Sequence, residues 1–190
     1  MLESEKFKRS QNAKCYAYIL AFVVFQVAVI LIFSLTVMRV KTPSVRLRSV
    51  QVQSLNINDN TTNPHFDMTL VAEIAIRNKN FGHFRFDNAA ANVTYGGVTV
   101  GDGEIVKARA SARKTKRMNV TLEVSSSGRV TETAKLSDDL RSGNLTLTSV
   151  ARVRGKVTLM KVMKKKKTAN MNCTMTVNLA TRAVHDLDCE

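Results

Sequence analysis

An apolar stretch near the N-terminus places the strongest constraint on how this chain can fold. Residues 16–38 read YAYILAFVVFQVAVILIFSLTVM, 23 residues without a charge, with Gln26 as the one strongly polar side chain. As an α-helix rising about 1.5 Å per residue, this stretch is about 35 Å long, enough to cross a hydrocarbon core of about 30 Å. We therefore expect a transmembrane helix over residues 16–38, preceded by a short basic cytosolic tail over residues 1–15.

A cleaved secretory signal is the alternative interpretation of this stretch. Signals have a shorter apolar region of about 7–15 residues and then a small-x-small cleavage site. Here the apolar run is longer and leads directly into Arg39, which favours an uncleaved anchor. Positive charge does not set the orientation, because four Lys or Arg side chains flank the span on each side. They are Lys6, Lys8, Arg9 and Lys14 before it, and Arg39, Lys41, Arg46 and Arg48 after it.

After the span, apolar and polar residues alternate with period two, which is typical of half-buried β-strands. Val45 and Leu47 alternate with Arg46 and Arg48, and the same pattern recurs in 66–76 and 118–124. Gly96-Gly97 between two alternating runs predicts a tight hairpin, because glycine accepts the positive φ that such turns require. In that hairpin Val93 would face Val100, and Tyr95 would face Val98.

Residues 130–140 break this alternation and favour one short helix. Val130, Ala134, Leu136 and Leu140 have helical spacing, and Gly143 is placed to end the helix. Strands then resume, with a β-bulge expected at Gly155. Many short strands and one helix predict a mainly β fold, an antiparallel β-sandwich like the immunoglobulin or fibronectin domains in architecture. We place this domain at residues 49–190, after a linker or first strand at residues 39–48.

The residues also resemble a known family over nearly the whole chain. A basic N-terminus and one span lead into SVQVQSLNI at residues 49–57, then Asn78-x-Asn80, Phe86-Asp87-Asn88 and VTYGG at residues 93–97. This pattern is similar to the plant late embryogenesis abundant group 2 proteins, also called the water-stress and hypersensitive-response domain family. The membrane-anchored type includes NDR/HIN-like defence proteins. The resemblance implies a β-sandwich, a stress or defence role, and no catalytic site; Lys79 departs from the proline that the family more often has.

The segment NKNFGHFRFDN, residues 78–88, contains His83, Arg85 and Asp87 and has two interpretations, an acid–base site or a turn. Catalysis needs a base that a third group orients within a cleft, and the sequence offers His83 no such partner. Phe84 and Phe86 would face the core, which points His83 and Arg85 to solvent. We therefore expect a structural turn and no enzyme activity. We also expect no metal site, because the three cysteines and three histidines lack metal-ligand spacing, and no cofactor.

Five N-glycosylation sequons follow the span and bear on which side of the membrane the C-terminal domain lies. They begin at Asn60, Asn92, Asn119, Asn144 and Asn172. Asn-x-Thr is also the polar–apolar–polar alternation of a strand, so the sequons support an extracytosolic domain only modestly. We expect the N-terminus in the cytosol and the C-terminal domain outside the cell, at the plasma membrane.

Cys173 and Cys189 are candidates for a disulfide. If the last segment is a hairpin turning about Thr181, the two cysteines lie directly opposite each other, as a cross-strand disulfide requires. The same register pairs Val177 with His185 and Met175 with Leu187. Two free thiols are the alternative. Cys15 precedes the span, where it is either a palmitoylation site or a bystander thiol.

Positive charge is the remaining functional signal. From residue 42 onward the chain has 23 Lys and Arg against 13 Asp and Glu, a net charge of +10. Either this is a solvated surface or its two dense clusters concentrate polyanions. The clusters, both expected on turns, comprise Lys107, Arg109, Arg113, Lys114, Lys116 and Arg117, and then Lys161, Lys164, Lys165, Lys166 and Lys167.

The expected partners follow from topology. Outside a plant cell the polyanions are acidic cell-wall polysaccharide and anionic lipid head groups, and a protein partner is also compatible. Aromatic residues do not interleave with the basic runs, which argues against specific nucleic-acid binding. We predict a non-enzymatic, single-pass membrane protein that acts in stress or defence as a tether or interaction module. The alternative is a cytosolic-facing adaptor that binds anionic lipid or RNA.

Overall fold

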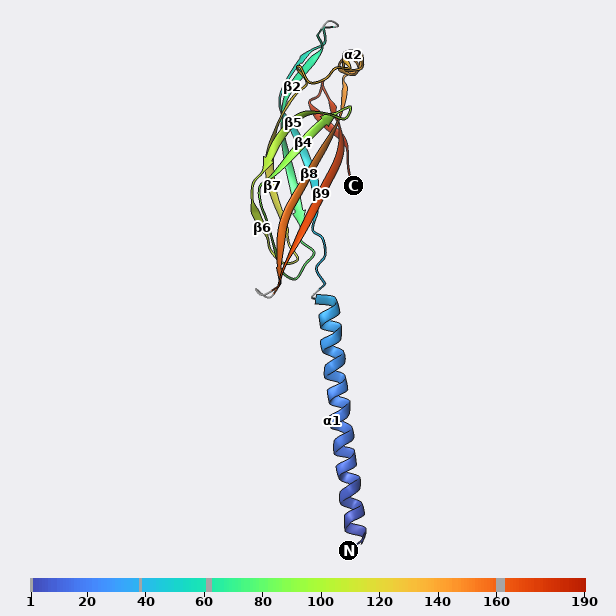
Figure 1. The fold of residues 1–190 in the computed structure, drawn as a ribbon. Helices are drawn as coiled ribbons and strands as arrows, with labels where there is room; N and C mark the ends of the chain where they lie inside the picture. The colour runs from blue at the N-terminus through green and yellow to red at the C-terminus, as the bar shows by residue number, and fades with distance from the viewer. Residues whose placement is uncertain (1, 38, 61–62, 160–162) are drawn as a thin grey trace. The chain divides into compact units, whose positions relative to one another are not determined.

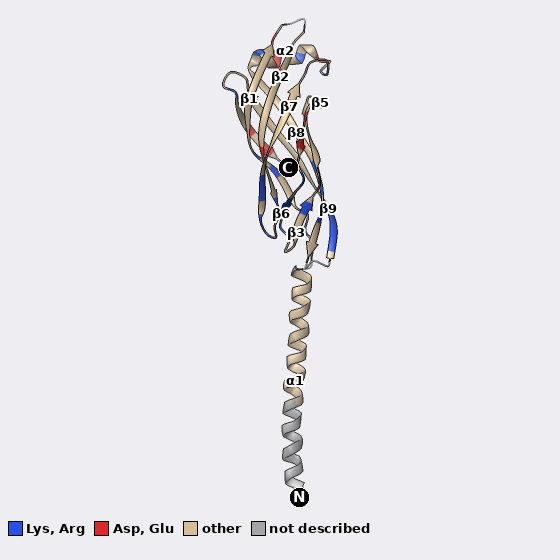
Figure 2. Cartoon of the chain, turned by 90° about the vertical axis from the view of Figure 1, so that its left-hand side faces the viewer, with Lys and Arg blue, Asp and Glu red and all other residues tan. Residues whose placement is uncertain are grey.

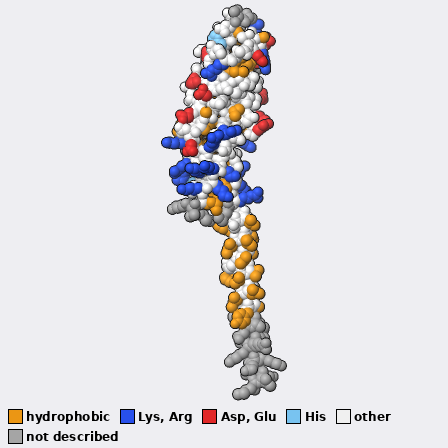
Figure 3. Space-filling model, viewed as in Figure 1, with side chains coloured by type: hydrophobic (Ala, Val, Ile, Leu, Met, Phe, Trp, Pro, Cys, Tyr) orange, Lys and Arg blue, Asp and Glu red, His pale blue; other side chains and the backbone are white. Residues whose placement is uncertain are grey.

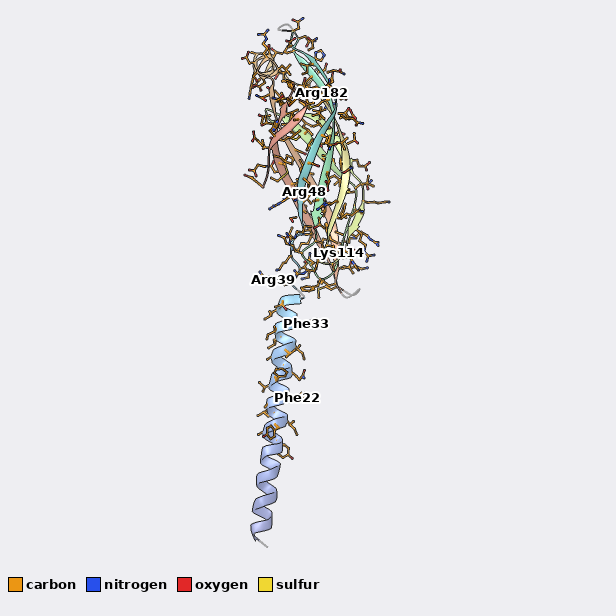
Figure 4. All side chains as sticks on the ribbon, turned by 180° about the vertical axis from the view of Figure 1, so that it is seen from behind. Phe22, Phe33, Arg39, Arg48, Lys114 and Arg182 are labelled. Carbon is orange, nitrogen blue, oxygen red and sulfur yellow. A yellow bond between two sulfur atoms is a disulfide. The ribbon has the colours of Figure 1, made fainter. Side chains whose placement is uncertain are left out.

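The chain forms two compact units, residues Met1–Val40 and Lys41–Glu190 (Figure 1). A computed structural model describes residues 2–37, 39–60, 63–159 and 163–190. The first unit is helix α1 (Leu2–Val37). Its segment Tyr16–Thr36 has a mean hydropathy of 2.7 and none of it is buried within the protein. Apolar side chains such as Phe22 and Phe33 project from the bare helix (Figure 4). By length and composition, α1 can cross a membrane.

The second unit is an antiparallel β-domain whose described residues form ten strands and one short helix. Hydrogen-bonded neighbours follow the order β1-β2-β7-β5-β4-β8-β3-β6, and β9 lies between β8 and β10. The sheet curves so that β1 packs against β9 and β10. The elements are β1 (Ser44–Asn58), β2 (His65–Arg77), β3 (His83–Phe86), β4 (Ala89–Tyr95), β5 (Val98–Ile105), β6 (Ala108–Ala110), β7 (Thr115–Ser125), α2 (Thr133–Ser142), β8 (Asn144–Leu159), β9 (Met163–Asn178) and β10 (Ala183–Cys189).

This architecture, between a sandwich and a barrel, confirms the predicted fold class. Strand alternation builds the core as expected: on β2, every second residue from Phe66 to Ile76 is buried. Phe84 and Phe86 on β3 are also fully buried and stack at 5.7 Å between ring centroids. The second compact unit begins at Lys41, and its first strand, β1, begins at Ser44. The first residues of β1 therefore lie within the segment 39–48, which was expected to be a linker or first strand.

The expected helix and hairpin are present with local differences. Gly143 ends α2 with φ of 78°, as predicted, but Ala134 is exposed and Val130 precedes the helix. Tyr95 faces Val98, and both glycines of the turn have positive φ. The predicted pairing of Val93 with Val100 is wrong. Val93 faces Gly101 instead, because a bulge inserts Val100 as an extra core residue.

Three other expectations about strands are wrong. Gly155 is not at a bulge, since β8 and β9 pair without interruption there. Glycine is needed because a Cβ would lie 2.4 Å from the Arg85 carbonyl oxygen and 2.6 Å from the Phe84 ring. Lys164–Lys167 belong to β9 rather than to a bend, because β8 continues far enough to pair with them. In the last hairpin, Val177 faces Val184 rather than His185.

Candidate anion-binding site

Two buried asparagines organise the end of the domain that contains the bends at residues 78–82 and 111–114. The side-chain amide of Asn78 donates to the carbonyl oxygens of Gly82, Ala110 and Ser111 at 2.7–3.2 Å. Its side-chain oxygen accepts hydrogen bonds from the backbone and side-chain nitrogens of Asn80, both at 3.0 Å. Both asparagines are almost fully buried. Neutral amides therefore hold the two bends together.

The chain enters the domain at this same end. The Lys41 amide donates to the Asn80 side-chain oxygen at 2.6 Å, and the Asn80 side-chain amide donates to the Lys41 carbonyl at 2.7 Å. The Asn80 carbonyl in turn accepts from the Arg113 amide at 3.0 Å. The first residue of the domain is thus fixed to the bend that carries Arg113 and Lys114.

Lys and Arg side chains are concentrated at this end of the domain, which we call the basic end. It comprises the bends 78–82 and 111–114 and the adjoining parts of β1, β2, β3, β6, β7, β8 and β9. Figures 2 and 3 show Lys and Arg concentrated there, while Asp and Glu lie further along the domain. Figure 4 shows Lys114 at this end and Arg182 toward the other. The sequence-predicted cations Lys107, Arg109, Arg113, Lys114, Lys116, Arg117, Lys164, Lys165, Lys166 and Lys167 are exposed or half-buried here; Lys161 lies outside the described residues.

A groove on this end brings together cations that the sequence analysis did not group. The hollow of about 370 Å³ lies over β1, β2 and β7, and we call it the arginine groove. Six of its nine lining residues are Arg or Lys and none is acidic. The lining residues are Ser44, Arg46, Arg48, Ala75, Arg77, Lys79, Arg113, Thr115 and Arg117.

Strand register creates the groove. Arg46 on β1 and Arg117 on β7 both pair with Ala75 on β2, so a small residue separates two long cations. In the next row, Arg77 is flanked by Ser44 and Thr115. Small side chains beside long ones leave a hollow walled by guanidinium groups. The signal for this site was present, because Arg46, Arg48 and Arg77 alternate with buried residues. The pairings of β1 with β2 and of β2 with β7 bring these three arginines beside Arg117.

The groove has little internal charge compensation. Among the described residues, one ion pair falls within 4.0 Å, between Arg117 Nε and Glu73 Oε1 at 3.6 Å, and both side chains are substantially exposed. Arg113 stacks over the Phe81 ring at 4.6 Å, and one of its guanidinium nitrogens donates to the Lys79 carbonyl at 3.3 Å. These contacts orient Arg113 and leave its charge unneutralised.

Comparison with known proteins identifies the family. The family model described as late embryogenesis abundant protein (LEA_2) matches residues 73–175. A late embryogenesis abundant protein of Arabidopsis thaliana, At1g64065, is 40% identical over 179 residues, which is 93% of this chain and 83% of that protein. The chain belongs to the late embryogenesis abundant group 2 family.

Solved structures resemble this LEA_2 chain more distantly. The solution structure of At1g01470 from Arabidopsis thaliana is 11% identical, covers 72% of this chain and 82% of its own, and has a TM-score of 0.43. A crystal structure of a protein from Archaeoglobus fulgidus is 12% identical, covers 68% of this chain and 96% of its own, and has a TM-score of 0.34.

In this LEA_2 protein, residues 83–86 within the segment 78–88 form strand β3, which pairs with β6 and β8. His83 and Arg85 are exposed on β3, with the buried Phe84 between them. They line an open hollow of about 370 Å³ with Asp87, Arg109, Lys156, Thr158 and Lys164. Among the described residues, no group of three His, Cys, Asp or Glu is placed to hold a metal ion.

Cys173 and Cys189 of the LEA_2 domain are joined by a disulfide, with S–S 2.05 Å. They pair directly even though the hairpin register differs by one residue near the turn, because an irregularity between His185 and Asp188 restores it. The five sequon asparagines are all exposed; Asn92, Asn119, Asn144 and Asn172 lie on strands, and Asn60 lies in the loop after β1.

Proposed function

We propose that this protein is a non-enzymatic, single-pass membrane protein of the stress or defence response, whose basic domain faces the extracytosolic side and tethers polyanionic material. The single observation that carries this proposal is the combination of one apolar helix with a separate domain whose cations are concentrated at one end. The plasma membrane is its proposed location. Acidic cell-wall polysaccharide and anionic lipid head groups are its proposed partners, alongside any protein partner.

The helix supports the anchor. A soluble helix hides its apolar side chains against a core, whereas Tyr16–Thr36 is apolar and wholly unburied. A helix that is hydrophobic all round belongs in a bilayer or within a large core.

The disulfide and the sequons support the extracytosolic side. Disulfides persist in oxidising compartments and are rare in the cytosol, and Cys173 lies in the core where exchange with soluble thiols is hindered. The exposed sequon asparagines are accessible to a glycan. These features favour the extracellular tether over an adaptor that faces the cytosol. The basic end is the one feature that supports the cytosolic adaptor.

A protease-protection assay on the full-length chain in sealed microsomes tests this topology. The domain should resist externally added protease, and N-glycosidase treatment should lower the apparent mass. Replacing the five sequon asparagines by Gln serves as the matched control, since that variant should keep its protection and lose the mass shift. Digestion of the domain in intact microsomes, without any mass shift, would instead support the cytosolic adaptor.

A further inference from the structure

We propose that the arginine groove binds the phosphate groups of anionic lipids in the same membrane that holds α1. This inference rests on the membrane anchor proposed above, but not on which side of the membrane the domain faces. It deepens that proposal by naming one ligand chemistry and one site, built largely from residues outside the basic runs of the sequence.

The shape of the groove suits a compact anion. A hollow of about 370 Å³ falls in the range of ligand pockets, roughly 300–1,000 Å³. Its floor is made by the small residues Ser44, Ala75 and Thr115. Neighbouring strands lie about 4.8 Å apart, so arginines on β1, β2 and β7 can reach one anion from several directions. Ser44 and Thr115 add hydroxyl donors to the same floor.

The charge of the groove favours phosphate. Guanidinium groups are planar and present paired N–H donors that match phosphate oxygens, which makes arginine the preferred residue for phosphate recognition. Five of the six cations in the groove are arginines. By contrast, the cations of Lys164–Lys167 are point charges on flexible stems, better suited to diffuse attraction. Among the described residues, Glu73 alone forms an ion pair with a groove cation, so a bound anion would offset the repulsion among the remaining cations.

The position of the groove selects lipid over other sources of phosphate. Lys41 is four residues beyond Val37, the last residue of α1, and a chain of that length reaches at most about 14 Å. Lys41 is fixed to Asn80, which is bonded to Arg113 in the wall of the groove. In a chain anchored through α1, this short connection gives the groove a high effective concentration of head groups from the same membrane, an advantage that a soluble source of phosphate lacks.

Lipid binding to the full-length chain in neutral detergent, followed by native mass spectrometry, tests the proposal. Phosphatidic acid and phosphatidylcholine are titrated into the wild type, into Arg46→Gln/Arg48→Gln/Arg77→Gln, and into Lys164→Gln/Lys165→Gln/Lys166→Gln. Both variants remove three positive charges from exposed positions at the basic end, so they have the same net charge. Thermal unfolding of each variant verifies that it is folded.

We expect the wild type to prefer phosphatidic acid, and the arginine variant to bind it at least about tenfold more weakly. The lysine variant should stay within about threefold of the wild type. If the two variants lose the same affinity for phosphatidic acid, net charge and not the groove determines binding. If the wild type binds phosphatidylcholine as tightly as phosphatidic acid, the groove has no preference for an anionic lipid. Either result overturns the proposal. Galacturonate oligomers are added as a competitor. If they displace the lipid from the wild type and do not bind the arginine variant, the groove is a polysaccharide site instead. None of these outcomes alters the microsome result, so a failure of the lipid site can be told apart from a failure of the proposed topology.

Discussion

At the end of the domain that carries α2, a charged group takes part in holding the structure together. The Tyr95 hydroxyl donates to Asp139 on α2 at 2.6 Å, and the Tyr95 ring packs edge-on against Phe66 at 6.2 Å. At the basic end, neutral asparagines make the buried structural contacts, and the cations around them are exposed or half-buried, with only surface contacts at Arg113 and Arg117 among the described residues. Charge is part of the fold at one end and separate from it at the other.

This difference explains why the basic end can accumulate like charges. A cation that makes a buried, necessary contact cannot serve a ligand without weakening the fold. Asn78 and Asn80 satisfy the backbone of both bends. Among the described residues, the side chains of Arg46, Arg48 and Arg77 make no hydrogen bond or ion pair that the fold depends on. Stability and charge are therefore separable here, and three substitutions test that separation.

The largest effect is expected from Asn78→Ala. The substitution leaves the buried carbonyls of Gly82 and Ala110 and the partly buried carbonyl of Ser111 without their donor, and it removes the acceptor of Asn80. Buried polar groups left unsatisfied cost about 1–3 kcal/mol each, so we expect the unfolding free energy to fall by about 3 kcal/mol. Denaturant unfolding of the full-length chain measures this loss.

Asn88→Ala is the matched control for this prediction. Asn88 also makes two side-chain hydrogen bonds, to Glu104 and from the Lys107 amide, but it is exposed and water can replace them. Its loss should stay below about 1 kcal/mol. Equal losses at the two positions would mean that the asparagine network does not hold the basic end.

Much of this arrangement was predictable from local sequence. Asn78 and Asn80 were expected in a turn, and Phe84 and Phe86 were expected in the core, because strand parity is a local property. The bulge at Val100, the close approach at Gly155 and the extension of β9 through Lys164–Lys167 were not predicted. Each depends on how far a partner strand continues, which the segment itself does not encode.

An intermediate effect is expected from Tyr95→Phe at the opposite end. The substitution removes the donor to Asp139 and leaves the ring packing in place. A hydrogen bond to a charged group contributes about 1.5–3 kcal/mol, and Asp139 is partly exposed, so we expect a loss of about 1.5 kcal/mol at pH 7.

The pH dependence of that loss distinguishes the hydrogen bond from packing. Burial, together with the Asp139 carboxylate, raises the pKa of Tyr95 well above its usual range. An unfolded tyrosine ionises near pH 10, so the stability that Tyr95 contributes is fully present below about pH 10 and falls as pH rises further. The wild type should lose its advantage over Tyr95→Phe in that window, as measured by unfolding at pH 8 to 11. Parallel curves for the two proteins would show that the hydroxyl contributes nothing through its protonation.

The arginine groove marks the limit of what the sequence could predict. Arg46 and Arg48 were recognised as the outward residues of a strand, and Arg113 and Arg117 as part of a basic run. Their union required the pairing of β2 with β7, two strands separated by about 40 residues of chain. Contacts at such sequence separation are not encoded in local alternation, so linear charge clustering found the lysine run and missed the groove.

The smallest effect on stability is expected from replacing Lys164–Lys167 by Ser. These lysines are exposed or half-buried on β9, their ammonium groups have no ion-pair partner among the described residues, and β8 pairs with their backbone, which serine preserves. The unfolding free energy should change by less than about 0.5 kcal/mol. Retention of the full-length chain on immobilised polygalacturonate should nevertheless fall, because four of the cations at the basic end are lost. The remaining retention should weaken between 0.1 M and 1 M salt, as the Debye length shortens from about 10 Å to about 3 Å. If retention is unchanged by both the substitution and the salt concentration, this lysine run is only a solvated surface. A large loss of unfolding free energy would instead mean that charge and fold are coupled at the basic end.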